Sequence, residues 1–285
     1  MFTRRKFLSS ASLAATLPAA RLAARQLSTI GVQLYTVRSV LPQKPAETLN
    51  AIASIGYREV EATYGGLDKI WAAIQATHLN AVSVHLDNTL MNPGKEDDLA
   101  RAIDQVKQKG FAYAVFPYVP PSERGALDKF RILSDKLNKA GEKCRAVGIS
   151  FCYHNHAFEF EPMEGTTGFQ VMMDRLDKKL CGFEVDVFWV SVAGHDPVEL
   201  LQKLSGRVPL IHLKDKAAGT PVMFRESVER SAFKEVGNGV LDWPRILRAA
   251  ASAGVQHYFV EQDQTPGDPV ESLRQSFAYL SKLQY

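Results

Sequence analysis

Short apolar runs alternate with longer helical patterns from Ile30 to the end of the 285-residue chain. The apolar runs are rich in Val, Ile, Phe and Tyr, which is typical of strands buried on both faces of a parallel sheet. We predict eight strands, at 31–37, 58–62, 81–86, 112–118, 149–154, 182–188, 208–213 and 257–261. Helical patterns fill the intervals, for example at 99–109, 127–147 and 243–253.

The connections between these units also repeat. Several predicted helices end in a glycine just before the next strand, at Gly56, Gly110, Gly148 and Gly254. Glycine adopts the left-handed conformation that ends a helix without a Cβ clash. Eight strand–helix units in about 255 residues match the usual size of a (β/α)8 barrel. A doubly wound sheet is the alternative, but no GxGxxG motif follows the first strand. The sequence therefore predicts an α/β protein, a single-domain (β/α)8 TIM barrel.

The first 26 residues have the pattern of an export signal. Arg4, Arg5 and Lys6 precede Phe7-Leu8 and a mild run of Ser, Ala and Leu. Adjacent arginines before such a run resemble the bacterial twin-arginine signal, and a short amphipathic helix is the alternative. The apolar run has about 14 residues, fewer than the roughly 20 that span a bilayer, so no stable membrane insertion is expected, although retention as an anchor stays open. We expect an export signal at 1–26, the barrel at 27–285 and a periplasmic or exported protein.

The positive charge of the chain lies in this same segment. The whole chain has 34 Lys and Arg against 31 Asp and Glu, a formal charge of +3. Five of the basic residues fall within the first 25 positions, which contain no acidic residue, so the remaining 29 basic and 31 acidic residues give a charge of −2. Because nucleic-acid binding depends on a basic surface, the slightly acidic barrel is not expected to bind nucleic acid.

Acidic and imidazole side chains gather where the predicted strands end. In (β/α)8 barrels the chemistry sits at the C-terminal ends of the strands. Strand alternation places Glu184 and Asp186 on one side, and it does the same for His212 and Lys214. Asp186, His212 and Glu261 each lie one residue past an apolar run, and this donor set suits one divalent ion such as Mn²⁺, Mg²⁺, Co²⁺ or Zn²⁺. Carboxylates converging in a barrel mouth would repel one another, and a bound cation relieves that repulsion.

Six segments together carry a family resemblance. They are Gly31–Arg38 (GVQLYTVR), Tyr153–His156 (YHNH), Glu184–Trp189 (EVDVFW), His212–Asp215 (HLKD), Glu235–Gly239 (EVGNG) and Val260–Asp263 (VEQD). In this order they resemble the sugar phosphate isomerase/epimerase group of the xylose isomerase-like TIM barrels, over roughly Ile30 to Leu283.

The resemblance implies one divalent metal, held by a Glu after strand five, an Asp after six, a His after seven and a Glu after eight. Asp186, His212 and Glu261 match the last three positions, but His154 stands where the family has its first Glu. Either His154 is the fourth ligand, or Glu159 reaches back to the metal, or three residues and water complete the shell.

The same resemblance implies proton abstraction next to the carbonyl of a sugar. We expect Glu261 to act as the base, with His156 or Lys214 handling the other proton. Expected substrate contacts are Gln33, Glu61, His85 and Trp189, with internal packing or hydrogen bonding as the alternative for each. Export argues against phosphorylated substrates, so the predicted function is a metal-dependent isomerase or epimerase of a non-phosphorylated keto-sugar.

The missing strand-five Glu keeps other functions open. A lyase or glycoside-cleaving enzyme that acts on 3-keto-glycosides by β-elimination needs only one base. A non-catalytic sugar-binding barrel is a further alternative. A nuclease of the endonuclease-IV type shares this barrel, but the charge of −2 on the barrel speaks against it. The expected partner is a small sugar, and the sequence leaves homo-oligomerisation open.

Overall fold

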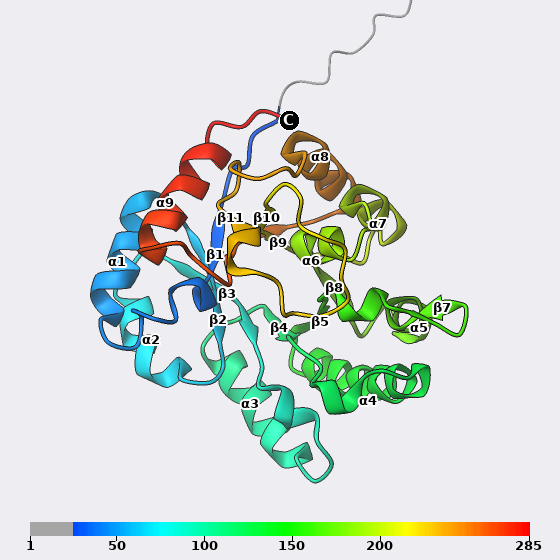
Figure 1. The fold of residues 1–285 in the computed structure, drawn as a ribbon. Coiled ribbons are helices and arrows are strands. Elements are labelled where there is room, and N and C mark those ends of the chain that lie inside the picture. Colours follow the sequence, from blue (N-terminus) through cyan, green and yellow to red (C-terminus); the bar gives the residue numbers. More distant parts are fainter. Residues whose placement is uncertain (1–24) are drawn as a thin grey trace, which may run out of the picture.

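The computed structural model describes residues 25–285, so the predicted export signal falls almost entirely outside the described residues. Eight parallel strands close into a barrel in the order β1-β12-β9-β8-β5-β4-β3-β2. Helices surround the barrel, as the view along its axis shows (Figure 1). The predicted (β/α)8 fold is therefore confirmed.

Each predicted strand is present in the barrel. The strands are β1 (Gly31–Gln33), β2 (Glu59–Thr63), β3 (Asn80–His85), β4 (Tyr113–Phe116), β5 (Ser150–His154), β8 (Gly182–Asp186), β9 (Leu210–Leu213) and β12 (His257–Val260). The first strand was expected at 31–37 but ends at Gln33, because the Gln33 side chain accepts a hydrogen bond from Tyr35 N and starts a 3-10 helix, η1 (Leu34–Val37). Likewise β8 ends at Asp186, whose carboxylate caps the next helix.

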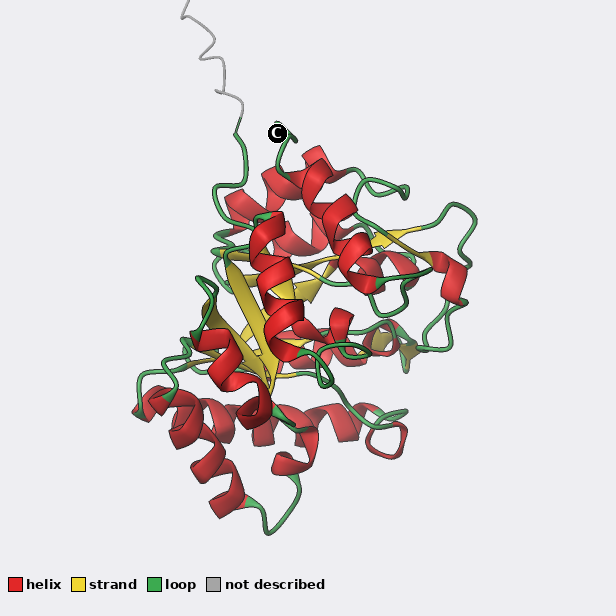
Figure 2. Cartoon of the chain, turned by 90° about the vertical axis from the view of Figure 1, so that its left-hand side faces the viewer, coloured by secondary structure: helices red, strands yellow, loops and turns green. Residues whose placement is uncertain are grey.

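The helices lie outside the strands, and the side view shows them flanking the sheet (Figure 2). They are α1 (Pro45–Ile55), α2 (Leu67–Gln75), α3 (Glu96–Gln108), α4 (Leu127–Ala146), α5 (Gly168–Arg175), α6 (Val187–Val192), α7 (Pro197–Lys203), α8 (Trp243–Ala253) and α9 (Pro269–Leu280). Shorter 3-10 turns are η2 (Asn88–Met91), η3 (Pro121–Glu123), η4 (Phe158–Phe160) and η5 (Arg230–Ala232). All four glycines expected to end helices have positive φ, between 78° and 130°, so that prediction is confirmed.

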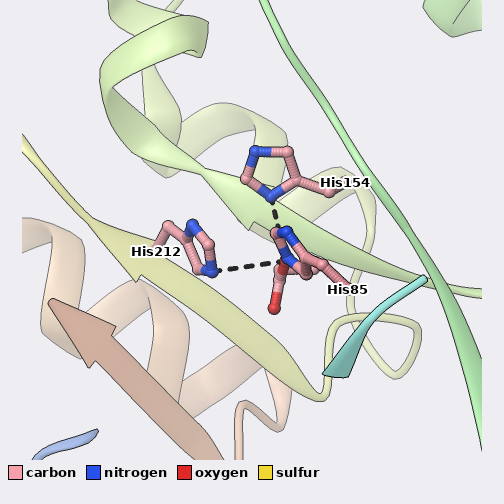
Figure 3. Close-up of side chains that lie close together, drawn as sticks. His85, His154 and His212 are labelled. Atoms are coloured by element: carbon pink, nitrogen blue, oxygen red, sulfur yellow. Dashed lines mark hydrogen bonds and ion pairs between the residues drawn. The ribbon is translucent and has the colours of Figure 1, made fainter. Parts of the chain in front are cut away.

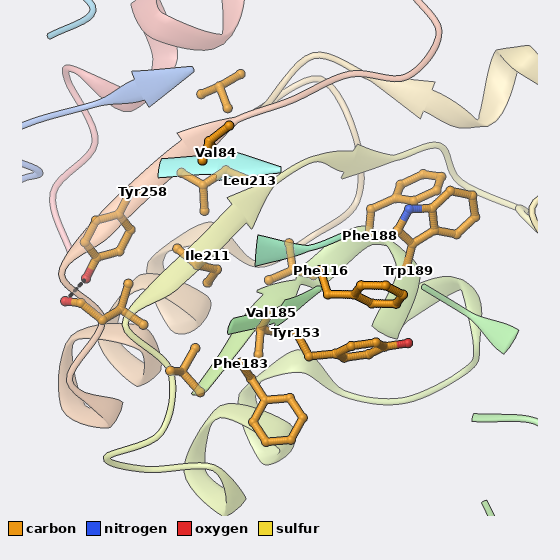
Figure 4. Close-up of a cluster of buried hydrophobic side chains, with 14 of the residues drawn as sticks. Val84, Phe116, Tyr153, Phe183, Val185, Phe188, Trp189, Ile211, Leu213 and Tyr258 are labelled. Carbon is orange, nitrogen blue, oxygen red and sulfur yellow. Dashed lines mark hydrogen bonds between the residues drawn. The ribbon is translucent and has the colours of Figure 1, made fainter. Parts of the chain in front are cut away.

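Strand alternation divides the barrel into an apolar outer layer and a mixed interior. Val185, Ile211 and Leu213 are fully buried in the core cluster drawn in Figure 4. The intervening residues of the same strands face the barrel axis. Toward the N-terminal ends these interior side chains are apolar and form a separate packed cluster of Val82, Tyr113, Val115, Cys152, Leu210 and Phe259. Toward the C-terminal ends they are polar, and the register places Asp186 beside His212 and His154 beside Glu184.

Two small antiparallel strand pairs form separate sheets beside the barrel. They are β6 (Pro162–Met163) with β7 (Thr166–Thr167), and β10 (Asp215–Lys216) with β11 (Phe233–Lys234).

The Asp215 carboxylate organises the connection that follows β9. Asp215 accepts hydrogen bonds from the backbone N–H groups of Lys216, Gly237, Gly239 and Leu241 and from the indole of Trp243. A side chain at Gly239 would collide with this carboxylate. The Gly-Asn-Gly segment at 237–239 thus forms a tight turn around this carboxylate, and the Asp242 side chain caps α8.

Within residues 25–285, no helix is both long enough and apolar enough to cross a membrane.

Candidate metal centre

A cavity of about 580 Å³ opens at the C-terminal ends of the barrel strands. Six residues singled out from the sequence line it: His85, His154, His156, Trp189, Lys214 and Glu261. The lining comes from segments far apart in the chain, brought together because parallel barrel strands all end at one face.

Asp186, His212 and Glu261 converge as the sequence predicted. His212 Nδ1 lies 2.7 Å from Glu261 Oε2 and 3.9 Å from Asp186 Oδ2. One potential ligand atom from each of the three lies within 4.8 Å of the others. All three side chains are buried, so charge at this point is poorly shielded by water.

His154 lies beside this triad, and Glu159 does not face it. His154 Nε2 is 3.7 Å from Asp186 Oδ2. The Glu159 carboxylate instead accepts hydrogen bonds from the Tyr153 hydroxyl at 2.6 Å and from the backbone N–H of His156 at 2.9 Å. Of the two side chains considered for the fourth position, His154 is therefore the one placed to contact a shared metal.

Lys214 sits among three carboxylates. Its Nζ lies 2.7 Å from Glu261 Oε2, 2.9 Å from Asp186 Oδ2 and 2.9 Å from Asp263 Oδ2. Glu184 is not one of these carboxylates, because the register places it beside Leu210, deeper in the barrel than Lys214, which follows the end of β9. Asp263 was missed as a site residue, although it ends the Val260–Asp263 segment that carried part of the resemblance.

Glu61 is held below the cavity by four donors. It accepts hydrogen bonds from Gln33 Nε2 at 2.8 Å, Ser83 Oγ at 2.5 Å and His212 Nε2 at 2.6 Å, and His85 Nε2 lies 3.0 Å away. Gln33 and Glu61 are completely buried and are not among the residues that line the cavity. The structure thus gives both residues the internal hydrogen bonds that were the alternative to direct substrate contact.

Glu184 is a second functional candidate, besides Asp263, that the sequence did not single out. Its Oε2 lies 2.8 Å from His85 Nε2, 2.9 Å from His154 Nδ1 and 3.3 Å from His212 Nε2. Figure 3 shows that the His85, His154 and His212 imidazoles lie close together. The alternation that placed Glu184 beside Asp186 was the available signal, but the register with β5 and β9, which brings the imidazoles to it, cannot be read from one strand.

The buried charges shift the imidazole pKa values in two directions. Burial alone would lower the pKa of His85, but the Glu61 and Glu184 carboxylates outweigh burial and raise it to about 10. Burial is likewise outweighed at His212, whose pKa is raised by Glu184, Glu61 and Glu261. The pKa of His154 is lowered by burial and by the charge of His212. His85 and His212 are thus cationic and His154 is neutral before any metal binds.

The proton-transfer candidates also differ in pKa. Burial and the Lys214 charge lower the pKa of His156, which leaves it neutral and able to accept a proton. Burial raises the pKa of Asp186 to about 6 against the opposing effect of Lys214. At Glu261 the Lys214 and His212 charges overcome burial and hold the pKa below its usual range. Glu261 is therefore a firmly ionised group, suited to binding a cation.

Buried polar atoms without hydrogen-bond partners gather at the same place. Among the described residues five such side-chain atoms occur, and four belong to the barrel mouth: His156 Nδ1, Glu184 Oε1, Asp186 Oδ2 and Trp189 Nε1. Asp186 Oδ2 faces the Lys214 ammonium but accepts no well-aligned hydrogen bond. Such atoms are costly unless something satisfies them. Imidazole and carboxylate donors this close suit a divalent transition-metal ion, so the residues present fit a metal at Asp186, His212, Glu261 and His154.

The chain belongs to the xylose isomerase-like TIM barrel family, whose model matches residues 49–283. Its curated relatives include an inosose dehydratase of Geobacillus thermodenitrificans (strain NG80-2), which is 26% identical over an alignment of 163 positions that covers 54% of this chain and 54% of the relative. The chain thus spans about half the length of the curated relatives that it matches.

Solved structures cover more of the chain. A sugar phosphate isomerase/epimerase from Parabacteroides distasonis ATCC 8503 superposes with a TM-score of 0.72 at 25% identity, over 89% of this chain and 93% of that chain. The IolI protein, whose structure contains a zinc atom, superposes with a TM-score of 0.68 at 13% identity, over 89% of this chain and 98% of that chain. At 13% identity the likeness to IolI is one of fold.

Proposed function

We propose that this protein is a metal-dependent isomerase or epimerase that removes a proton next to the carbonyl of a non-phosphorylated keto-sugar or keto-cyclitol. The observation that carries the proposal is the convergence of Asp186, His212, Glu261 and His154 in the barrel mouth, where His154 and Glu261 line a cavity of about 580 Å³. A divalent cation held by these residues supplies Lewis-acid polarisation of a carbonyl.

The chain provides two groups for moving the proton. His156 is neutral, lines the cavity and has an unpartnered Nδ1, so it suits the role of the base. The Lys214 ammonium also lines the cavity and can return a proton. Glu261, held in its ionised form by Lys214, serves the cation better than it serves as the base.

The charges around the cavity favour an uncharged sugar. Its lining includes four acidic residues, Asp87, Glu226, Glu261 and Asp263, against three cationic ones, Arg38, Lys214 and His85. Lys214 is already surrounded by three carboxylates, and Arg38 donates to the backbone oxygen of Asp263 and lies over the Tyr35 ring. His85 is likewise held between Glu61 and Glu184. Every lining cation therefore already has an acceptor within the protein, and none is free to pair with a phosphate. The twin-arginine-type pattern at residues 4–8 supports export of the protein from the cytoplasm. An exported enzyme meets free sugars rather than phosphorylated ones.

β-Elimination is a second candidate, and one observation favours it. The matched curated relatives are named inosose dehydratases, and a dehydratase removes water. Elimination begins with the same proton abstraction but needs no second base on the opposite face of the sugar. Because His154 stands where the family has its first glutamate, the site has one carboxylate fewer that could act as this second base.

Product analysis distinguishes the two outcomes. We would incubate the metal-loaded protein with a panel of 3-keto-glucosides, free ketoses and inososes, each beside a phosphorylated counterpart, and follow the products by ¹³C NMR. A new stereoisomer or an aldose–ketose pair supports the isomerase or epimerase, and an unsaturated ketone supports elimination. Faster turnover of the phosphorylated compounds would contradict the substrate class, and no turnover of any of them would contradict both reactions.

A further inference from the structure

Each candidate metal-binding imidazole has a carboxylate on the side of the ring that faces away from the metal. At His154, Nδ1 lies 2.9 Å from Glu184 Oε2 while Nε2 faces Asp186. An ionised carboxylate can only accept a hydrogen bond, so the His154 proton sits on Nδ1. This leaves the Nε2 lone pair directed toward Asp186.

His212 shows the same arrangement with its ring nitrogens reversed. Its Nε2 lies 2.6 Å from Glu61 Oε1, and its Nδ1 faces Glu261 and Asp186. His212 is cationic in the metal-free protein and has a carboxylate at each ring nitrogen. A metal beside Asp186 and Glu261 would displace the Nδ1 proton, while Glu61 keeps the proton on Nε2. The two histidines therefore use different nitrogens, and each choice is set by a buried carboxylate that does not itself face the metal.

His85 joins these two carboxylates. Its Nε2 lies 3.0 Å from Glu61 Oε1 and 2.8 Å from Glu184 Oε2, so one N–H is shared between them. Its ring also stacks on His212, with centroids 5.5 Å apart and planes 13° apart. His85 fixes the separation of the two carboxylates and, through them, the orientation of both imidazoles.

We propose that Glu61, Glu184 and His85 are positioning residues that set the tautomers of His212 and His154, so that a metal is bound through His212 Nδ1 and His154 Nε2. This inference rests on the proposed metal site. Hydrogen bonds of this kind orient ligating imidazoles and make their free nitrogen more basic, and their loss costs about 10–100-fold in metal affinity.

Glu184→Met tests the inference, because methionine fills the space of the buried side chain but accepts no hydrogen bond. Glu184→Gln is the conservative rescue, since its amide oxygen still accepts from His154 Nδ1. Glu59→Met is the matched control: Glu59 comes from β2, like Glu61, and pairs with His257 Nδ1 at 2.9 Å at the opposite end of the barrel. Affinity for Co²⁺ is measured by competition with a chelator, and metal-bound nitrogens are assigned by ¹⁵N NMR of the Zn²⁺-loaded protein with labelled histidine.

We expect Glu184→Met to bind Co²⁺ about 10–100-fold more weakly, Glu184→Gln to recover most of that loss and Glu59→Met to match the wild type. If Glu184→Met does not fold, Glu61→Met replaces it, because it removes the acceptor for His212 Nε2 in the same way, and Glu61→Gln is then its conservative rescue. Unchanged affinity in folded Glu184→Met, or a metal bound through His212 Nε2, would overturn the positioning role and leave the metal site standing. A wild-type protein that binds no divalent ion would overturn the proposed function and this inference together.

Discussion

The Lys214 ammonium lies 2.7 Å from Glu261 Oε2, and His212 Nδ1 lies 2.7 Å from the same oxygen. This oxygen belongs to a carboxylate that we propose as a metal ligand. A lysine in this position neutralises the acidic cluster in the metal-free protein and competes with a divalent ion for the same oxygens. Metal binding and the freeing of Lys214 for proton transfer are therefore linked.

Replacing Lys214 with methionine should strengthen metal binding and destabilise the metal-free protein. The competing charge disappears, so we expect Co²⁺ affinity to rise several-fold. The carboxylates of Asp186, Glu261 and Asp263 lose their shared counter-ion, so the metal-free variant should melt at a lower temperature than the wild type. Calorimetric titration and melting curves with and without metal measure both effects, and weaker Co²⁺ binding in the variant would show that Lys214 supports the metal rather than opposes it.

Asp186 has two roles that a single substitution can separate. Its Oδ1 accepts hydrogen bonds from Phe188 N at 2.9 Å and Trp189 N at 3.1 Å, which caps α6, and its Oδ2 faces the metal position. Asp186→Asn keeps an oxygen for the cap but removes the charge, so we expect a folded protein that no longer retains stoichiometric metal. Asp186→Ala should lose the cap as well, at a cost of about 1 kcal/mol. Metal content by mass spectrometry beside the free energy of unfolding checks both, and full metal retention by folded Asp186→Asn would rule out its role as a ligand.

Asp215 should be structural, even though it lies one residue from Lys214. All five of its hydrogen-bond partners are N–H donors. In Asp215→Asn one carboxylate oxygen becomes an NH₂ group that faces donors, so we expect a loss of about 2–4 kcal/mol in unfolding free energy. Urea unfolding measures this loss. A variant as stable as the wild type would show that the turn at 237–239 does not depend on the carboxylate.

The sequence predicted the features that depend on single segments of the chain, and it missed those that depend on how the strands pair in the closed barrel. Eight strands, the glycine helix ends and the convergence of Asp186, His212 and Glu261 follow from periodicity within single segments, because alternation and strand ends are local properties. The role of Glu184 depends on its register with β5 and β9, and that of Glu61 on a bond to a histidine 151 residues away. Such pairings arise from barrel closure, and no local pattern contains them.

Glu159 should make folding stability depend on pH. Burial raises its pKa to about 7, in spite of the hydrogen bond from Tyr153 that opposes the shift. The folded protein then binds a proton that the unfolded chain has lost above its ordinary carboxyl pKa, so stability falls as pH rises from about 4.5 to about 7 and levels off above that. The shift corresponds to about 3 kcal/mol.

Glu159→Gln removes this titration while it keeps an acceptor for the Tyr153 hydroxyl. We expect the wild type to lose up to about 3 kcal/mol more than the variant between pH 4.5 and pH 7.5, measured as the difference between two series of urea unfolding curves. Parallel pH profiles for the two proteins would show that Glu159 is ionised throughout this range.

Solvent deuterium exchange is the most direct measurement of proton abstraction at the metal centre. A 3-keto-glucoside or an inosose is incubated in D₂O with the protein loaded with 0 to 1 equivalents of Co²⁺ or Mn²⁺, and the residual proton signal next to the ketone is followed in samples from which the metal has been removed. We predict exchange at that carbon whose rate rises with metal content up to one equivalent and which is absent in Asp186→Asn. Exchange no faster than in buffer for every substrate, or exchange that does not depend on metal, would contradict a metal-dependent isomerase or epimerase.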